Sequence, residues 1–329
     1  MAAGRHGPAE AFLYVDGFNL TAAKLSALNH KTGAPLVESH GLGDSWKERA
    51  PLGVQEAELV QEGAFFDTRT GLSHDALKAS VPSSVQAVKR VVTFGYAGVA
   101  IGDGFFGFEG AYSHEYQVAA TKEDLQRANA AYSVSGRQDE GSILQPLEAK
   151  TADWNTEAAG QVDYSLDTAQ RVVPITSSSV ANPSIITTPV PHGLTNGQKV
   201  LIAGHTGSTP AINGEHVATV ISATTFSIPV NVTVGGTGGT LVQANSLNGG
   251  AGYLQVTAFS GFSGFVGKVR HSDDDVTYVD LATFANITSA PGKERVAVAP
   301  GTTVRRYLAF DGNVTGSGSI TVFSGFARA

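Results

Sequence analysis

The sequence contains no cysteine and one methionine, and Asp, Glu, Lys and Arg together make up only 16% of its 329 residues. The absence of cysteine excludes disulfides, thiol catalysis and thiolate metal sites. No apolar run approaches the ~20 residues that a membrane-spanning helix requires. The first residues, MAAGRHGPAEAF, lack the apolar centre of a signal peptide. We therefore expect a soluble protein that is made in a cytoplasm.

What the sequence does contain is typical of a β-rich protein. Hydrophobic residues make up 42% of the chain, which is enough for a substantial core, and glycine is abundant at 39 residues. Many Gly, Thr, Ser and Val residues with few charges indicate strands joined by frequent turns. The net charge of −7 argues against a surface that holds nucleic acid, because phosphate binding requires clustered Lys and Arg.

The stretch from Leu52 to Tyr96 predicts a strand, a short helix and a second strand. The first strand covers VQEAELVQEGAFFD and ends in a polar turn. Ser73 is a suitable N-cap for the helix HDALKAS, in which Leu77 points inward. Pro82 ends that helix, and a β-rich run follows from Val85. One short helix between two strands favours a β-barrel or β-sandwich with a single packed helix.

A long polar segment precedes this unit. Residues 31–53 show little periodicity, and connections of this length are usually functional or interaction loops. Trp46 lies among charged residues there, as expected for a side chain that a partner covers. Upstream of it, a strand begins at Phe12 and leads into a turn at Asp16-Gly17.

Residues 121–134 allow two interpretations. Thr121 and Asp124 resemble a capping box that opens a helix. Alternatively, 121–124 form the tip of a hairpin that continues into a strand from Ala128 to Val134, and we favour the hairpin. Residues 137–171 are polar. Charged residues then almost vanish up to Gln243, where short Thr- and Val-rich strands predict a self-contained β-module. The remaining chain predicts an antiparallel sandwich.

Three short motifs are more consistent with turns than with ligand sites. Gly102–Gly107 fits GxGxxG, but an aromatic strand follows where a dinucleotide site needs a helix. Gly261–Lys268 approaches a phosphate-binding loop with the wrong spacing. Asp273–Asp275 lacks the alternation of a calcium loop. We therefore expect no cofactor.

No catalytic or metal-binding motif is evident either. His192, His205 and His216 share the predicted module without zinc-site spacing, and we expect them to be scattered surface histidines. No GxSxG elbow occurs. We expect no metal, no catalytic residue and no enzyme activity.

The order of the segments resembles that of a known family. The strand LYVDGFNLT, the polar loop ending in WKERAPLG, and AELVQEGAFFDTRTGLSHDALKA followed by VVTFGYAGVAIG are similar to the major tail (tail tube) proteins of long-tailed, siphovirus-type bacteriophages and prophages. The end of the chain, from QVTAFSGFSG to SITVFSGFARA, resembles the extra domain of such proteins in actinobacterial phages. The stretch PHGLTNGQKVLIAGHTG is similar to a small β-module of phage virion proteins, and its insertion departs from the family's usual connection.

This resemblance implies a mainly β fold, a tail-tube β-sandwich or barrel with one short flanking helix, plus two outer modules. The expected domains are a tail-tube domain at 1–150, a connector at 151–171, an inserted β-module at 172–243 and a C-terminal β-sandwich at 244–329. It implies stacked hexameric rings in a virion tail, with DNA in non-specific transit through the lumen. The implied partners are the tape-measure, tail terminator and tail-tip proteins, without membrane insertion.

The resemblance also assigns the polar loop to contacts between rings or subunits. The expected contact residues are Leu36, Val37, Trp46, Lys47, Glu48 and Arg49. The outer modules would decorate the tube and contact a host surface or its glycans. The alternative is a β-sandwich decoration or carbohydrate-binding protein that forms no tube. That class does not need the strand–helix–strand unit with its long loop.

Overall fold

The computed structural model describes residues 10–34, 36–39, 48–51, 55–67, 73–78, 89–120, 125–157, 162–163, 171–194, 196–243, 249–273 and 275–328. The fold is mainly β, as the sequence predicts, and most of its sheet pairing is antiparallel. Within the described residues, no helix has the length and apolar character needed to cross a membrane.

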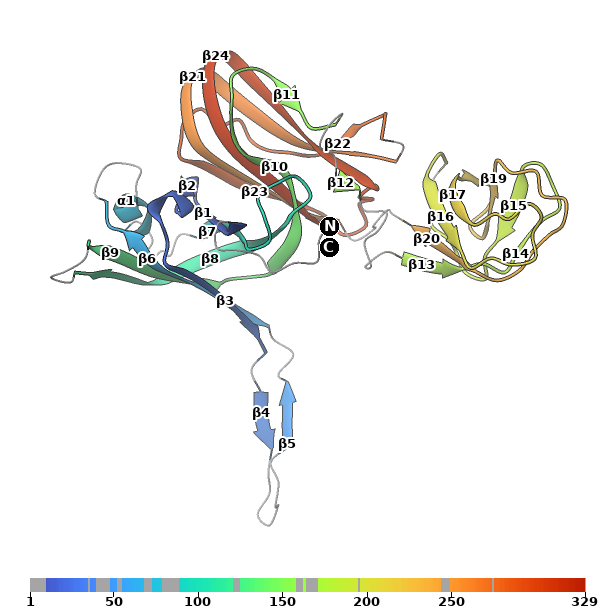
Figure 1. Ribbon diagram of the computed structural model, residues 1–329, viewed down its shortest axis with the longest axis horizontal. Coiled ribbons are helices and arrows are strands. Elements are labelled where there is room, and N and C mark those ends of the chain that lie inside the picture. Colours follow the sequence, from blue (N-terminus) through green and yellow to red (C-terminus); the bar gives the residue numbers. More distant parts are fainter. Residues whose placement is uncertain are drawn as a thin grey trace.

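One large sheet forms the body of the protein (Figure 1). Its strand order is β2-β1-β7-β8-β10-β24-β21-β22. The strands are β1 (Phe12–Val15), β2 (Phe18–Asn19), β7 (Arg90–Gly95), β8 (Gly104–Ala119), β10 (Gln138–Lys150), β21 (Gly250–Ser272), β22 (Val279–Thr283) and β24 (Tyr307–Arg328). A short 3-10 helix, η2 (Thr21–Ala23), follows β2. The predicted strand at Phe12 and the turn at Asp16-Gly17 are confirmed.

A branch of three strands leaves the body at β8. The second half of β8 pairs with β9 (Arg127–Val134), β9 pairs with β6 (Glu56–Phe65), and β6 pairs with β3 (Ala27–Gly33). Since β8 and β9 pair as antiparallel neighbours, the hairpin interpretation of this segment is confirmed, although its tip at 121–124 lies outside the described residues. Gly102–Gly107 leads from a turn into β8, so that motif opens no helix.

Strand β1 is buried on both faces and separates two cores. Leu13 and Val15 belong to a core beneath the helix, which we call the helix-side core; Phe12 and Tyr14 belong to a central core. The helix-side core contains Leu13, Val15, Leu20, Leu59, Leu77, Val92, Phe94, Phe108, Ala111, Ala128, Ala130 and Tyr132. The central core contains Phe12, Tyr14, Phe105, Ile143, Ala251, Tyr253 and Phe323. A strand that is apolar on both sides reads as a continuous run in the sequence, as FLYV does.

The predicted helix is present as α1 (Ser73–Lys78) and covers one side of the branch. Leu77 is fully buried in the helix-side core, as expected. The Ser73 hydroxyl donates to the carbonyl oxygen of Phe65 at 2.5 Å and accepts from the backbone N–H of Asp67 at 3.1 Å. This side chain therefore fixes the helix to the end of β6. The residues around Pro82 lie outside the described part of the chain.

The expected boundary between the tail-tube domain and the C-terminal domain differs from the structure. Strand β10 pairs with β8 on one side and β24 on the other, so 1–150 and 244–329 share one sheet. The expected connector also contributes two short strands to it, β11 (Trp154–Asn155) and β12 (Val162–Asp163), both paired with β24. Strand β10 contributes few apolar side chains: Ile143 and Leu144 enter different cores, and Leu147 packs against the central core. Such a short apolar pattern did not predict a strand.

The C-terminal segment is built on two strands of unusual length, β21 and β24, which belong to the large sheet and do not form a separate sandwich. Strands β21 and β24 run antiparallel over most of their lengths, with register shifts near Val256 and Phe262. Bulges of this kind bend a strand without ending it. Gly261, with φ of 81°, lies in such a bend. Strand β23 (Gly292–Val298) pairs with the first part of β21. Asp273 and Asp275 lie in the turn after β21.

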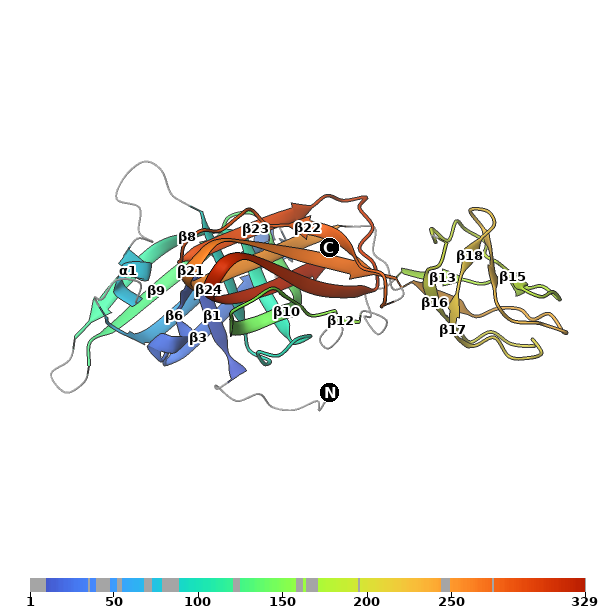
Figure 2. The same cartoon turned by 90° about the horizontal axis from the view of Figure 1, so that it is seen from above.

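Residues 171–243 form two small sheets around their own core, beyond one end of the body (Figure 2). The first sheet contains β13 (Arg171–Pro174), β20 (Thr240–Gln243), β16 (Lys199–Ala203) and β17 (Gly214–Val217). The second contains β14 (Ser177–Ser178), β15 (Ser184–Thr187), β19 (Thr225–Ile228) and β18 (Thr219–Val220). We call this part the inserted module.

Candidate functional site: a projecting hairpin and an open sheet face

The polar segment expected to be a loop contains a β-hairpin. Strand β4 (Leu36–Ser39) pairs with β5 (Glu48–Pro51), and the pair lies beyond the ends of β3 and β6. Figure 1 shows this hairpin, the arm, projecting away from the body. Its strands were missed because LVES and ERAP lack the apolar alternation that marks a half-buried strand.

Four of the six expected contact residues lie on the arm. Leu36 and Val37 are on β4, opposite Pro51 and Ala50. Glu48 and Arg49 are on β5, opposite Ser39 and Glu38. The structure thus brings these four together on one element. Trp46 and Lys47 lie outside the described residues.

The branch below the arm has one covered and one open face. Side chains alternate between the faces of a strand: Leu59, Ala130 and Tyr132 enter the helix-side core, and their sequence neighbours point to the other side. We call that side the open face. Its side chains include Lys31, Glu56, Glu58, Glu62, Glu115, Gln117, Arg127 and Ser133.

The open face carries more negative than positive charge. Four of its residues are glutamates, and the bases among them are Lys31 and Arg127. Glu58 lies opposite Lys31 on one side and Ser133 on the other. The Nε2 of His114 lies 3.4 Å from the Oε1 of Glu58, with both side chains more than 40% exposed. Arg127 is held over the ring of Phe65, with its guanidinium carbon 4.8 Å from the ring centroid. The alternating acids of β6 were the sequence signal for this face.

The branch sheet has a free edge at each side. Strand β3 pairs with β6 alone, and the second half of β8 pairs with β9 alone, among the strands that the structure describes. The phenol of Tyr96 donates to the carbonyl oxygen of Leu28 at 3.3 Å, and burial raises the pKa of Tyr96 to about 12. Because β3, β6, β9 and β8 alternate in direction, these two edges run antiparallel to each other. Unpaired edges of this kind can accept a further strand.

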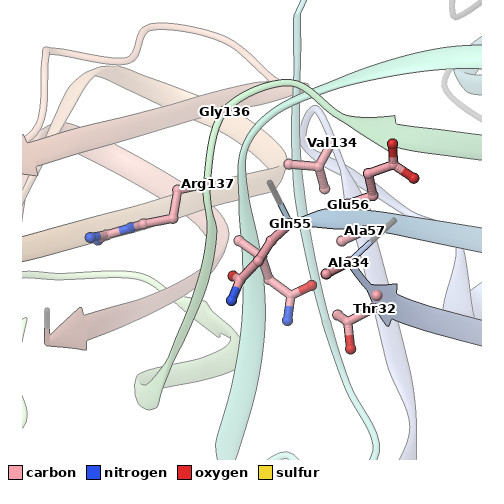
Figure 3. Close-up of a pocket in the computed structure, with 10 residues that line it drawn as sticks. Thr32, Ala34, Gln55, Glu56, Ala57, Val134, Gly136 and Arg137 are labelled. Atoms are coloured by element: carbon pink, nitrogen blue, oxygen red, sulfur yellow. The ribbon is translucent and has the colours of Figure 1, made fainter. Parts of the chain in front are cut away.

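A hollow of about 830 Å³ lies at the base of the arm. Figure 3 shows side chains from the end of β3, the start of β6 and the turn between β9 and β10 around it. Arg137 extends away from the others, and its Nε donates to the Oδ1 of Asp139 at 2.6 Å. The lining residues are Thr32, Gly33, Ala34, Gln55, Glu56, Ala57, Val134, Gly136, Arg137 and Gln138. The arm therefore leaves the body beside space for another chain segment.

Two of the three histidines expected on the surface of the inserted module are buried, and the third, His216, is half-buried with its Nε2 2.7 Å from the carbonyl oxygen of Ile212. His192 and His205 are buried, at 1% and 4% exposure. His205 contacts the Ser178 hydroxyl at 2.9 Å and the Gly238 carbonyl at 2.7 Å. Their ring nitrogens satisfy buried polar groups, a role that sequence spacing does not reveal. In the part of the chain that is described, no three His, Asp or Glu side chains gather into a metal-binding group.

No model of a known protein family matches the chain, and no curated protein matches its sequence. Among solved structures, the chain is similar to SPP1 Dit (gp 19.1), described as a paradigm of the hub adsorption apparatus in phages that infect Gram-positive bacteria. The sequence identity is 8% and the TM-score is 0.26, over 97% of this chain and 99% of that one. A TM-score this low carries no argument about the fold or the function of this chain.

Proposed function

We propose that this protein is a structural component of a phage tail, and that it assembles into stacked hexameric rings that form the tail tube. The proposal rests on the sequence resemblance and on one structural observation. Among the strands that the structure describes, the branch sheet has two free edges that run antiparallel to each other, so that one edge can pair with the other edge of a neighbouring copy.

The edges supply the contact between neighbours in a ring. Strand β3 of one copy adds to the second half of β8 in the next copy, and the backbone hydrogen bonds continue from subunit to subunit. A contact between two different surfaces closes into a ring when the rotation from one copy to the next adds up to a full turn. In such a ring, the three branch strands of each copy and the second half of its β8 join those of the other copies in one closed sheet, and closure removes the free edges.

The open face then becomes the inner wall of the tube. DNA in transit meets the four glutamates of each copy, and like charge keeps the phosphates from adhering. The tape-measure protein occupies the same lumen before DNA passes. The helix α1 covers the opposite side of the branch, which places the body's cores outside the wall. This role involves no catalysis.

The arm makes the contact between rings. It projects from the end of β3 and β6, and in a stacked tube it extends from one ring to the next. The inserted module lies at the other end of the body from α1 (Figure 1), where it points outward and is available to a host surface. The tail terminator and tail-tip proteins would bind the rings that end the tube.

Negative-stain electron microscopy of the purified protein at high concentration tests this function. We expect rings or tubes of uniform diameter with knobs on the outside. Because a tube protein can require an initiator, the same experiment is repeated with the tail-tip proteins of its phage. Single compact particles in both experiments would contradict the proposal and favour a decoration or carbohydrate-binding protein.

A further inference from the structure

The inserted module is connected to the body by charged contacts. Its core consists of residues between Val173 and Leu241, and the cores of the body contain none of them. Among the described residues, therefore, no buried apolar cluster crosses the joint. The chain enters and leaves the module on adjacent strands, since Arg171 lies opposite Gln243 in the β13–β20 pair. The joint is consequently narrow and polar.

Arg306 is the centre of this joint. It precedes β24 in the body and is only 6% exposed. Its Nε and Nη2 donate to the two carboxylate oxygens of Asp163 at 2.7 and 2.9 Å. The same Nη2 lies 2.7 Å from the Oε1 of Glu215, on strand β17 of the module. One guanidinium therefore binds a carboxylate of the body and a carboxylate of the module together.

Tyr307 provides a second contact of the same kind. The guanidinium carbon of Arg306 lies over the Tyr307 ring, 4.7 Å from the ring centroid. The Nζ of Lys199 also lies over this ring, 5.7 Å from the centroid. Lys199 is on β16, the strand that pairs with β17. The module thus presents an acid and a base, side by side, to an arginine and an aromatic ring of the body.

Opening this joint costs little free energy, because no buried charge loses all of its partners. Breaking a buried ion pair is expensive when it leaves a charge without a partner. Here Arg306 retains both bonds to Asp163 when Glu215 leaves, and the side chain of Glu215 is already 49% exposed. Lys199 likewise moves into water. Charge pairs of this type are weakened by salt.

We propose that Glu215 and Lys199, binding Arg306 and Tyr307, form a salt-sensitive clasp, and that the module has a second, released position. At low ionic strength the module is docked against the body. At high ionic strength, or beside a polyanion that competes for Arg306 and Lys199, it is released from the body. This inference does not depend on the tail-tube function.

Distance measurement by double electron–electron resonance tests the clasp in the full-length chain. The absence of cysteine allows spin labels to be placed at Val99→Cys in the body and Val180→Cys in the module, both of which are exposed positions. We expect one narrow distance distribution at about 50 mM salt. It should broaden at about 1 M salt, where the screening length falls to about 3 Å, with the ratio of docked to released molecules falling about twofold to fivefold.

Charge reversal separates the clasp from simple packing. Glu215→Lys places a cation against Arg306 and should give the broad distribution even at low salt. Glu148→Lys is the matched control, because it disrupts an exposed pair with Lys150 on the body at 2.8 Å, and it should leave the narrow distribution unchanged. Circular dichroism checks that each variant is folded. A single distance at every salt concentration and in Glu215→Lys would overturn the proposal, and so would a broad distribution in the unaltered joint at low salt.

Discussion

The backbone N–H of Gly17 donates a hydrogen bond of 2.6 Å to the Oε1 of Gln255, a residue 238 positions further along the chain. The Nε2 of Gln255 donates in turn to the carbonyl oxygen of Val91 at 3.1 Å. The turn packs tightly against the backbone of Gly292, because a Cβ at Gly17 would lie 2.6 Å from it. Neighbouring Asp16 contacts Arg90 at 2.6 Å and also Lys293. The first hairpin of the chain is thus fixed to its last segment.

We predict that Gln255→Leu destabilises both ends of the body together. The substitution leaves the buried Gly17 N–H without this partner, while the Val91 carbonyl keeps the hydrogen bond from the Asp16 N–H. We expect a loss of about 1 to 3 kcal/mol of unfolding free energy. Urea denaturation measures the loss, and hydrogen exchange should accelerate in both β7 and β24. Gln117→Leu, at an exposed position of β8, is the control. Faster exchange in β24 alone would show that the two parts fold independently.

Sequence reasoning was accurate where a local pattern decides the structure. The continuous apolar run FLYV, the Asp16-Gly17 turn and the short helix around Leu77 each follow from residues that are close in the chain. The β-class of the protein follows from composition. These features require no knowledge of which distant segment packs against them.

What the sequence did not reveal depends on distant partners. Strand β10 was missed because Ile143 and Leu144 face different cores, so that no apolar face repeats along it. The arm was missed because the sequences of β4 and β5 do not alternate between apolar and polar residues. The union of both chain ends in one sheet rests on β10–β24 pairing and on the contact of Tyr253 with Asp139 at 2.5 Å. Pairings of this kind leave no mark on local periodicity.

The arm is expected to be necessary for stacking and unnecessary for folding. Deleting residues 36–50 removes β4 and most of β5 but leaves the β3–β6 pairing intact. We expect a soluble protein with an unchanged melting temperature that fails to form tubes in electron micrographs. A variant with residues 36–50 present but scrambled serves as the length control. Normal tubes from the deletion variant would show that the arm does not join rings.

Blocking the edge of β3 should prevent rings from closing. The carbonyl of Leu28 accepts from Tyr96, so the even-numbered residues of β3 direct their backbone groups away from β6. Thr32→Pro therefore removes a donor from the free edge without removing one from the β3–β6 ladder. We expect monomers that retain their circular dichroism spectrum and form no rings. Thr32→Ala should assemble normally, and rings from both variants would exclude β3 as the contact.

Charge reversal on the open face should make the tube retain DNA. With Glu58→Lys, Glu62→Lys and Glu115→Lys combined, assembled tubes should bind DNA at about 50 mM salt and release it as the salt concentration rises. The reason is that the logarithm of the binding constant falls with the logarithm of the salt concentration, with a slope of about −0.9 for each phosphate that is neutralised. Co-sedimentation of DNA with tubes measures this effect. The same change at Glu140, Glu294 and Asp280, outside the open face, should have a much smaller effect. Equal retention by both variants would argue against the open face as the lumen wall.

His271 should make the body less stable in acid. It is 7% exposed and accepts from the backbone N–H of Arg305 through Nδ1 at 3.3 Å. Burial, and then the positive charge of Arg305, lower its pKa to about 4. In the unfolded chain the pKa is about 6.5, so between these values the unfolded state binds more protons. The stabilising effect is therefore complete above about pH 6.5 and is lost as the pH falls through about 4.

The variant His271→Asn isolates this effect, because an amide oxygen keeps an acceptor for Arg305 and does not titrate. We expect the unfolding free energy of the unaltered protein to fall by about 2 to 3 kcal/mol more than that of the variant between pH 7 and pH 4. Urea denaturation at several pH values measures both curves. Parallel curves would mean that protonation of His271 is accommodated in the folded state, and that the acid sensitivity of the body arises from other groups.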